Sequence, residues 1–74
     1  MYMDTEKEKL KLLGRNIAKY RKNLGYSQNK FVEIINISRE HLAKIETGRR
    51  RLSLKLLFKI ADSLNVSEKV FFEF

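Results

Sequence analysis

The chain has 74 residues, of which 43% are hydrophobic, so the sequence predicts a single domain over residues 1–74 with room for one small core. It contains no cysteine, which excludes disulfides and thiolate metal sites and favours a cytoplasmic protein. Its net charge is +7 and its longest apolar run is three residues, so the sequence predicts neither a membrane span nor a secretory signal.

The absence of proline, the small number of glycines and the many helix-forming residues predict an all-α fold. A first helix is expected to begin with a capping box of Thr5 and Glu8 and to end at Gly25, which suits a left-handed C-cap. Residues 1–4 are expected to be frayed. One apolar stripe runs along this helix at steps of three and four residues: Leu10, Leu13, Ile17, Tyr20 and Leu24.

Two short helices follow, each opened by a serine. Ser27 is expected to cap a helix over residues 28–35, and Ser38 a helix over about residues 39–47. Asn36 suits the tight turn between them, because asparagine is among the few residues besides glycine that tolerate a left-handed conformation. This arrangement is typical of a helix-turn-helix, whose second helix enters the major groove of DNA.

Two further serines predict the remaining elements. Ser53 is expected to cap a fourth helix with a clean apolar stripe, and Ser67 a last short turn over Glu68 to Phe72. The sequence therefore predicts a compact five-helix domain with a central helix-turn-helix.

The positive charge is concentrated on the segment that contains this motif. Residues 15–55 hold eleven Lys and Arg against three Glu, a net charge of +8, whereas residues 1–14 sum to zero and residues 56–74 to −1. A segment this polarised favours a polyanionic partner. A solvated charged face is the alternative that composition leaves open.

Five segments match a known family in order and spacing over about 60 residues: Gly14–Ile17 with Arg21, Gly25–Gln28, Ile37–Ser38, Ile45–Gly48 and Leu57–Ser67. From Leu13 to Phe72 the chain thus resembles the phage-repressor-like (Cro/C1, XRE-type) helix-turn-helix family. The resemblance implies a repressor-like fold and a regulator that binds operator DNA. The family usually has alanine, glycine and proline where Val32, Asn36 and Leu52 stand, and none of these positions faces DNA.

The resemblance also assigns DNA contacts to the motif. Gln28 and the neighbouring Asn29 would bind a phosphate with side chain and backbone N–H groups, with an ordinary exposed glutamine as the alternative. Arg39 would pair with a guanine edge and Glu40 would accept from a cytosine amine. The other residues expected at this interface are Ser38, His41, Ala43 and Lys44. Glu40 and Lys44 are also spaced as an ion pair, as on an ordinary charged surface helix.

Further roles are expected for basic residues outside the two helices. Arg49, Arg50 and Arg51 would contact the phosphate backbone beside the second motif helix, with a solvated loop as the alternative. Weaker phosphate candidates on the first helix are Arg15, Asn16 and Lys19.

In the family the positions of Arg21 and Glu46 tend to form a partly buried ion pair, so we expect their loss to reduce stability before specificity.

The C-terminal end is rich in phenylalanine. One small core is not expected to bury all the apolar side chains of this segment, which are Val70, Phe71, Phe72 and Phe74. They predict a symmetric homodimer through the last two helices, which would hold two recognition helices about 34 Å apart. The alternative is that Phe71 or Phe72 closes the core.

These observations together predict a bacterial or phage-type transcriptional regulator that binds double-stranded operator DNA as a homodimer. With no cysteine, one histidine and no carboxylate pair in a recognisable cleft, no enzyme, metal site, cofactor or small-molecule ligand is expected. The end of the chain looks like a restriction–modification controller protein, with an antitoxin-type autorepressor and a phage Cro-like protein as rivals. The alternative class is a protein-interaction module that uses the phenylalanine-rich end.

Overall fold

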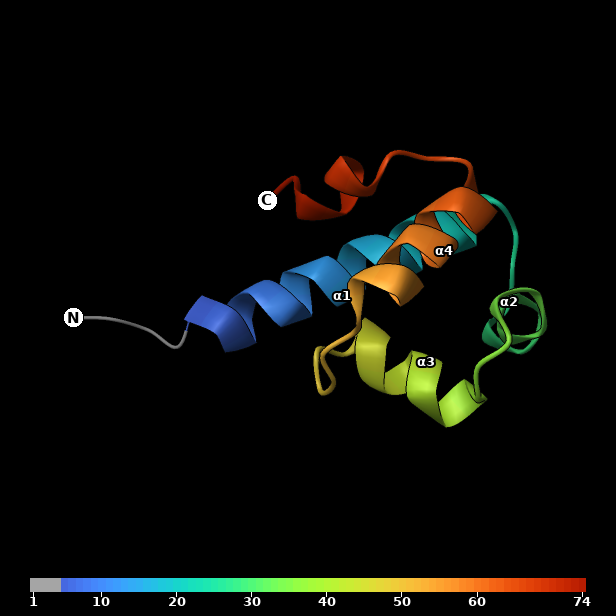
Figure 1. Ribbon diagram of the computed structural model, residues 1–74, viewed down its shortest axis with the longest axis horizontal. Coiled ribbons are helices and arrows are strands. Elements are labelled where there is room, and N and C mark those ends of the chain that lie inside the picture. Colours follow the sequence, from blue (N-terminus) through green and yellow to red (C-terminus); the bar gives the residue numbers. More distant parts are fainter. Residues whose placement is uncertain (1–4) are drawn as a thin grey trace.

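The computed structural model describes residues 5–74, and all regular secondary structure in that range is helical. Four α-helices and one 3₁₀ helix follow one another (Figure 1): α1 (Thr5–Asn23), α2 (Gln28–Ile35), α3 (Arg39–Glu46), α4 (Leu54–Leu64) and η1 (Glu68–Phe72). The predicted all-α fold is confirmed, with a 3₁₀ helix as the fifth element. Residues 1–4, predicted to be frayed, lie outside the described part. None of the described helices is long and apolar enough to cross a membrane.

Local sequence signals explain where most helices begin and end. Four serine side chains accept a backbone N–H at the predicted helix starts: Ser27, Ser38, Ser53 and Ser67. Gly25 with φ 81° and Asn36 with φ 59° adopt the predicted left-handed conformation. Asn65, with φ 58°, ends α4 in the same way. Thr5, predicted to be the N-cap of the first helix, is instead the first residue of α1.

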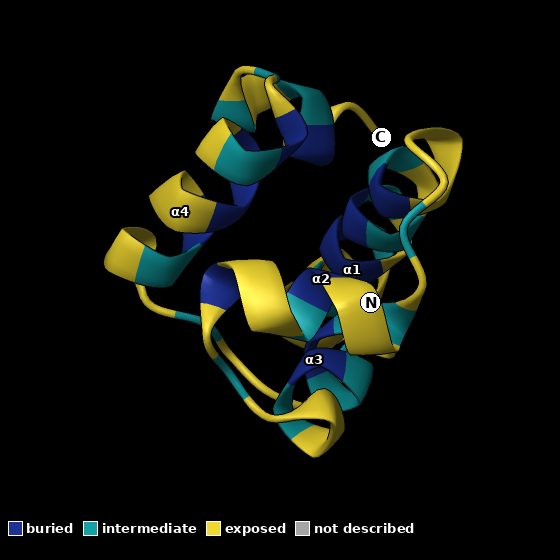
Figure 2. Ribbon diagram, turned by 90° about the vertical axis from the view of Figure 1, so that its right-hand side faces the viewer, coloured by how far each residue is buried: buried dark blue, intermediate teal, exposed yellow. Residues whose placement is uncertain are grey.

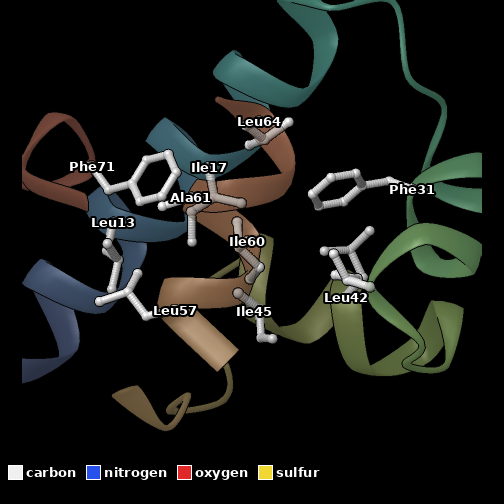
Figure 3. Packing of buried hydrophobic residues seen from close by; sticks show 11 residues of the cluster. Leu13, Ile17, Phe31, Leu42, Ile45, Leu57, Ile60, Ala61, Leu64 and Phe71 are labelled. Carbon is white, nitrogen blue, oxygen red and sulfur yellow. The ribbon is translucent and has the colours of Figure 1, made fainter. Parts of the chain in front are cut away.

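One hydrophobic core joins all five helices. Figure 3 shows Phe71 beside Leu13 at one end of the core, Phe31 beside Leu42 at the other, and Ile60 between them. The buried sides of the helices turn toward one another and their exposed sides outward (Figure 2). The complete buried set is Leu13, Ile17, Phe31, Ile35, Leu42, Ile45, Leu57, Ile60, Ala61, Leu64 and Phe71. The motif helices therefore have no separate core of their own and are held by α1 and α4.

Helix α1 has α3 packed on one side and η1 on the other. In both views α3 lies below α1 and the C-terminal segment above it (Figures 1 and 2). The approach of α3 is close because Gly14 has no side chain. A Cβ at Gly14 would overlap the carbonyl oxygen of Ile45 and lie 2.8 Å from that of Glu46. The glycine thus determines how deeply α3 sits against α1.

Three sequence predictions about α1 and the C-terminal segment are corrected by this packing. Phe71 is 0% exposed and lies edge-on to Tyr20 with 5.9 Å between ring centroids, so it closes the core and cannot line a dimer interface. Asn16 does not face a phosphate site, because its Nδ2 donates to the carbonyl oxygen of Phe71 at 2.9 Å. Leu24 lies beyond the end of α1 and is 53% exposed.

Candidate nucleic-acid interface

Helix α3 presents a polar surface whose direction is set by the core. Leu42 and Ile45 are buried, so the opposite side of the helix faces outward. The Ser38 hydroxyl accepts the N–H of His41 at 3.0 Å and holds the start of the helix in place. Of the residues predicted to contact DNA here, Arg39 and Glu40 are exposed, and His41, Ala43 and Lys44 are half-buried. A short helix with exposed donors and acceptors in its first turn fits the major groove.

A buried ion pair fixes the other end of α3. Arg21 is 5% exposed, and its Nε donates to Glu46 Oε2 at 2.7 Å while its Nη2 donates to Oε1 at 3.0 Å. The remaining guanidinium nitrogen, Nη1, donates to the carbonyl oxygen of Tyr26 at 2.6 Å. The pair implied by the resemblance is therefore present, and it joins the end of α1, the loop before α2 and the last turn of α3.

Gln28 is the third member of this network. Its Nε2 donates to Glu46 Oε1 at 2.9 Å, so the side chain is half-buried and held, unlike an ordinary exposed helix glutamine. The amide nitrogen carries two hydrogens, and this bond uses one of them. The first N–H groups of any α-helix lack partners inside the helix. Gln28 thus brings a side-chain donor to the last turn of α3, and Asn29 is exposed at the start of α2.

The arginine-rich loop after α3 turns back on α1. Gly48 has φ 74° and packs on α1 so closely that a Cβ would lie 2.7 Å from Lys11 Cα. Arg49 and Arg50 are exposed beyond this turn. Arg51 is also exposed, but its guanidinium forms a two-point contact with Glu6, with 3.0 Å between Nη2 and Oε1. A phosphate contact by Arg51 would compete with this ion pair.

A cleft of about 460 Å³ lies between α1 and the two motif helices. Arg15, predicted as a weaker phosphate contact, lines it, whereas Lys19 lies outside it with Nζ 5.9 Å from the centroid of the Tyr20 ring. Sequence reasoning missed Lys11 and Lys22, whose spacing from Arg15 puts all three on one helix face. The complete lining is Lys11, Arg15, Ala18, Lys22, Gln28, Ala43, Glu46 and Thr47.

One arrangement that the sequence allows is not formed in the described part of the chain. Glu40 and Lys44 make no ion pair over residues 5–74, so the polar side of α3 is not closed by their mutual contact. In the same residues, no three His, Cys, Asp or Glu side chains are grouped to hold a metal ion. What α3 offers is a surface of hydrogen-bonding groups.

Comparisons with known proteins agree with this geometry. Residues 17–71 match the helix-turn-helix family. The uncharacterized HTH-type transcriptional regulator YazB of Bacillus subtilis (strain 168) is 41% identical over 54 residues, which cover 73% of this chain and 78% of YazB. The restriction-modification controller protein C.AhdI from Aeromonas hydrophila has a similar fold, with a TM-score of 0.80, 25% identity, and coverage of 85% of this chain and 96% of that chain.

A second solved structure, the clp gene regulator ClgR from C. glutamicum, is also similar. Its TM-score is 0.80 at 25% identity, over 85% of this chain and 82% of that chain. The family match runs from within α1 through both motif helices and α4 into η1. The chain therefore belongs to the phage-repressor-like (Cro/C1, XRE-type) helix-turn-helix family of transcriptional regulators.

Proposed function

We propose that the protein is a sequence-specific regulator that binds operator DNA as a homodimer and acts by occupying its site, without catalysis. The observation that carries this proposal is the outward polar face of α3, which is held at one end by the Ser38 cap and at the other by the buried Arg21–Glu46 pair. A helix fixed in this way loses little further freedom on entering a groove, so less of the interaction energy is spent on ordering it. Operator binding would take place in the cytoplasm.

In this mechanism the groups around α3 have separate tasks. Arg39 donates to a guanine edge and Glu40 accepts from a cytosine amine, with Ala43 and Lys44 further along the same helix. Gln28 and Asn29 bind a backbone phosphate at the start of α2, because helix N-termini attract anions. Ser38, His41 and the loop arginines 49–51 would contact the DNA at the edges of this interface. Backbone contacts set the register, and base contacts select the sequence.

The function is tested by selecting duplexes from a random-sequence DNA pool at two salt concentrations and sequencing what is retained. We expect a palindromic consensus, with the logarithm of affinity falling by about 0.9 per log unit of salt for each phosphate contacted. The spacing of the half-sites then gives the separation of the α3 helices of the two protomers. If the retained duplexes share no consensus and all sequences bind weakly, the proposal is overturned.

Replacing Arg39 by alanine is expected to weaken binding to the selected consensus by about 5- to 150-fold, the range for one lost bidentate base contact. Binding to an unrelated duplex is expected to change much less, because that binding depends on phosphates. Arg49→Gln is the matched control, since it removes one exposed loop arginine and should weaken both duplexes alike. Equal losses on both duplexes for Arg39→Ala would remove this residue from base recognition. Fluorescence anisotropy measures the affinities of the wild type and of both variants for the two duplexes.

The proposed dimer surface is an aromatic patch formed by Phe72 and Phe74, whose ring centroids are 6.5 Å apart. The two residues are 49% and 54% exposed, and Phe74 borders an apolar groove of about 350 Å³ over Leu12 of α1. Half-buried Val70 lies in the same segment. This segment and α3 lie on opposite sides of α1 (Figures 1 and 2), so a partner on the aromatic patch leaves α3 uncovered.

Phe72→Asp is expected to convert the dimer to a monomer, because a carboxylate in an apolar interface must be desolvated. Loss of the second half-site contact should then reduce affinity for the palindrome by about 100-fold or more. Leu24→Asp is the matched control, because Leu24 is 53% exposed and follows the C-terminal end of α1, whereas Phe74 lies near the N-terminal half of that helix. Light scattering after size exclusion gives the mass of each variant. A wild-type protein that is monomeric at micromolar concentration and on DNA would contradict the dimer.

A further inference from the structure

The cleft between α1 and the motif helices is lined by three positively charged side chains that form no ion pair within residues 5–74. Lys11 and Lys22 are exposed and line it together with Arg15. The acidic residue in the lining is Glu46, which is neutralised by Arg21. Three uncompensated cations on one concave surface raise the local concentration of anions.

The position of these cations follows from the backbone packing described above. Gly14 lets α3 lie against α1, and Gly48 holds the next loop on the backbone of Lys11. As a result the exposed face of α1 borders the same cleft as Ala43 of α3 and Gln28 of α2. At 1.5 Å per residue, Lys11 and Lys22 lie about 16 Å apart along α1, far enough to contact at least two phosphates of one strand.

We propose that the sugar–phosphate backbone of the bound duplex runs over this cleft, with Lys11, Arg15 and Lys22 as a second set of phosphate contacts. This inference rests on the proposed function, because it takes Gln28 and Ala43 as the near edge of the DNA interface. Continuity with that edge favours a DNA strand as the occupant. The cleft contacts would add affinity and set register on any sequence, while base selection remains with α3.

The test is the double variant Lys11→Gln with Lys22→Gln, which removes two charges while keeping helix-forming side chains of similar length. We expect its affinity to fall by the same factor on the selected consensus and on an unrelated duplex. The slope of log affinity against log salt should become shallower by about 1.8, which is about 0.9 for each lost phosphate contact. Circular dichroism melting of the free protein should be unchanged.

The matched control is Lys59→Gln with Lys69→Gln, which removes the same charge from exposed lysines outside the cleft. Its salt slope should stay within measurement error of the wild type. Equal slopes for both double variants would overturn the inference, because the effect would then be one of net charge alone. An unchanged slope for the cleft variant would also overturn it. If the wild-type protein binds no duplex with a salt-dependent affinity, the proposed function itself fails, and the two results are distinguishable.

Discussion

Replacing Arg21 by alanine is expected to lower the free energy of unfolding by about 3–5 kcal/mol, the range for removing one partner of a buried ion pair. Glu46 would then be left nearly buried with only Gln28 as a partner, since the side chain of Glu46 is 6% exposed. The carbonyl oxygen of Tyr26 would also lose its donor. For a domain of this size the melting temperature should fall by about 12 °C or more. Thermal unfolding followed by circular dichroism measures this change.

The chain contains a matched control for the Arg21 variant. Glu6 and Arg51 also form a two-point arginine–carboxylate contact, but their side chains are 55% and 77% exposed. Glu6→Gln should therefore change the free energy of unfolding by at most about 1 kcal/mol, because exposed pairs contribute little. If Arg21→Ala melts at the wild-type temperature, the buried network is not what holds α3 in place.

A double substitution separates two causes of the loss. Arg21→Met combined with Glu46→Leu removes both charges and leaves no buried carboxylate without a counterion. We expect it to be more stable than Arg21→Ala, although Gln28 and Tyr26 still lose a partner. If the two variants are equally unstable, the missing hydrogen bonds rather than the uncompensated charge explain the loss.

The parts of the fold that could be predicted from sequence depend on local chemistry. The Ser38 hydroxyl accepts the N–H of His41, three residues further on, and the Asn36 N–H donates to the carbonyl oxygen of Val32, four residues back. Gly25, at the end of the first helix segment, likewise acts through its own backbone conformation. Such signals need no knowledge of tertiary packing, so the number and order of the helices followed from them.

The parts that could not be predicted are contacts between residues distant in sequence. Asn16 has the same type of polar side chain as a phosphate contact, and only packing reveals its bond to the carbonyl of Phe71, 55 residues away. Whether Phe71 or Phe72 is buried depends on how η1 is rotated against α1 and α4. The hydrogen bond from Gln28 to Glu46 likewise arises from the arrangement of α2 and α3. The basic face of α1 is different, because the spacing of Lys11, Arg15 and Lys22 was visible in the sequence.

Replacing Gly14 by alanine is expected to lower the free energy of unfolding by at least about 2 kcal/mol, which is within the usual range for overpacking a core. In an exposed helix the same substitution would stabilise by about 1 kcal/mol, because alanine has the higher helix propensity. The sign reverses here because the added Cβ would overlap backbone atoms of Ile45 and Glu46, which cannot rotate away. Lys9→Ala, at an exposed position of the same helix, is the control and should change stability little.

Gly14→Ala should also weaken DNA binding under conditions in which the variant is still folded. To relieve the overlap, α3 must move away from α1, and this movement displaces Arg39 relative to Lys11 and Lys22. Base contacts and cleft contacts could then no longer be made together, so affinity should fall on the consensus more than on an unrelated duplex. Measuring both affinities well below the melting temperature separates this effect from unfolding. A variant as stable as the wild type with unchanged affinity would mean that the α1–α3 contact adjusts freely and does not set the geometry of the interface.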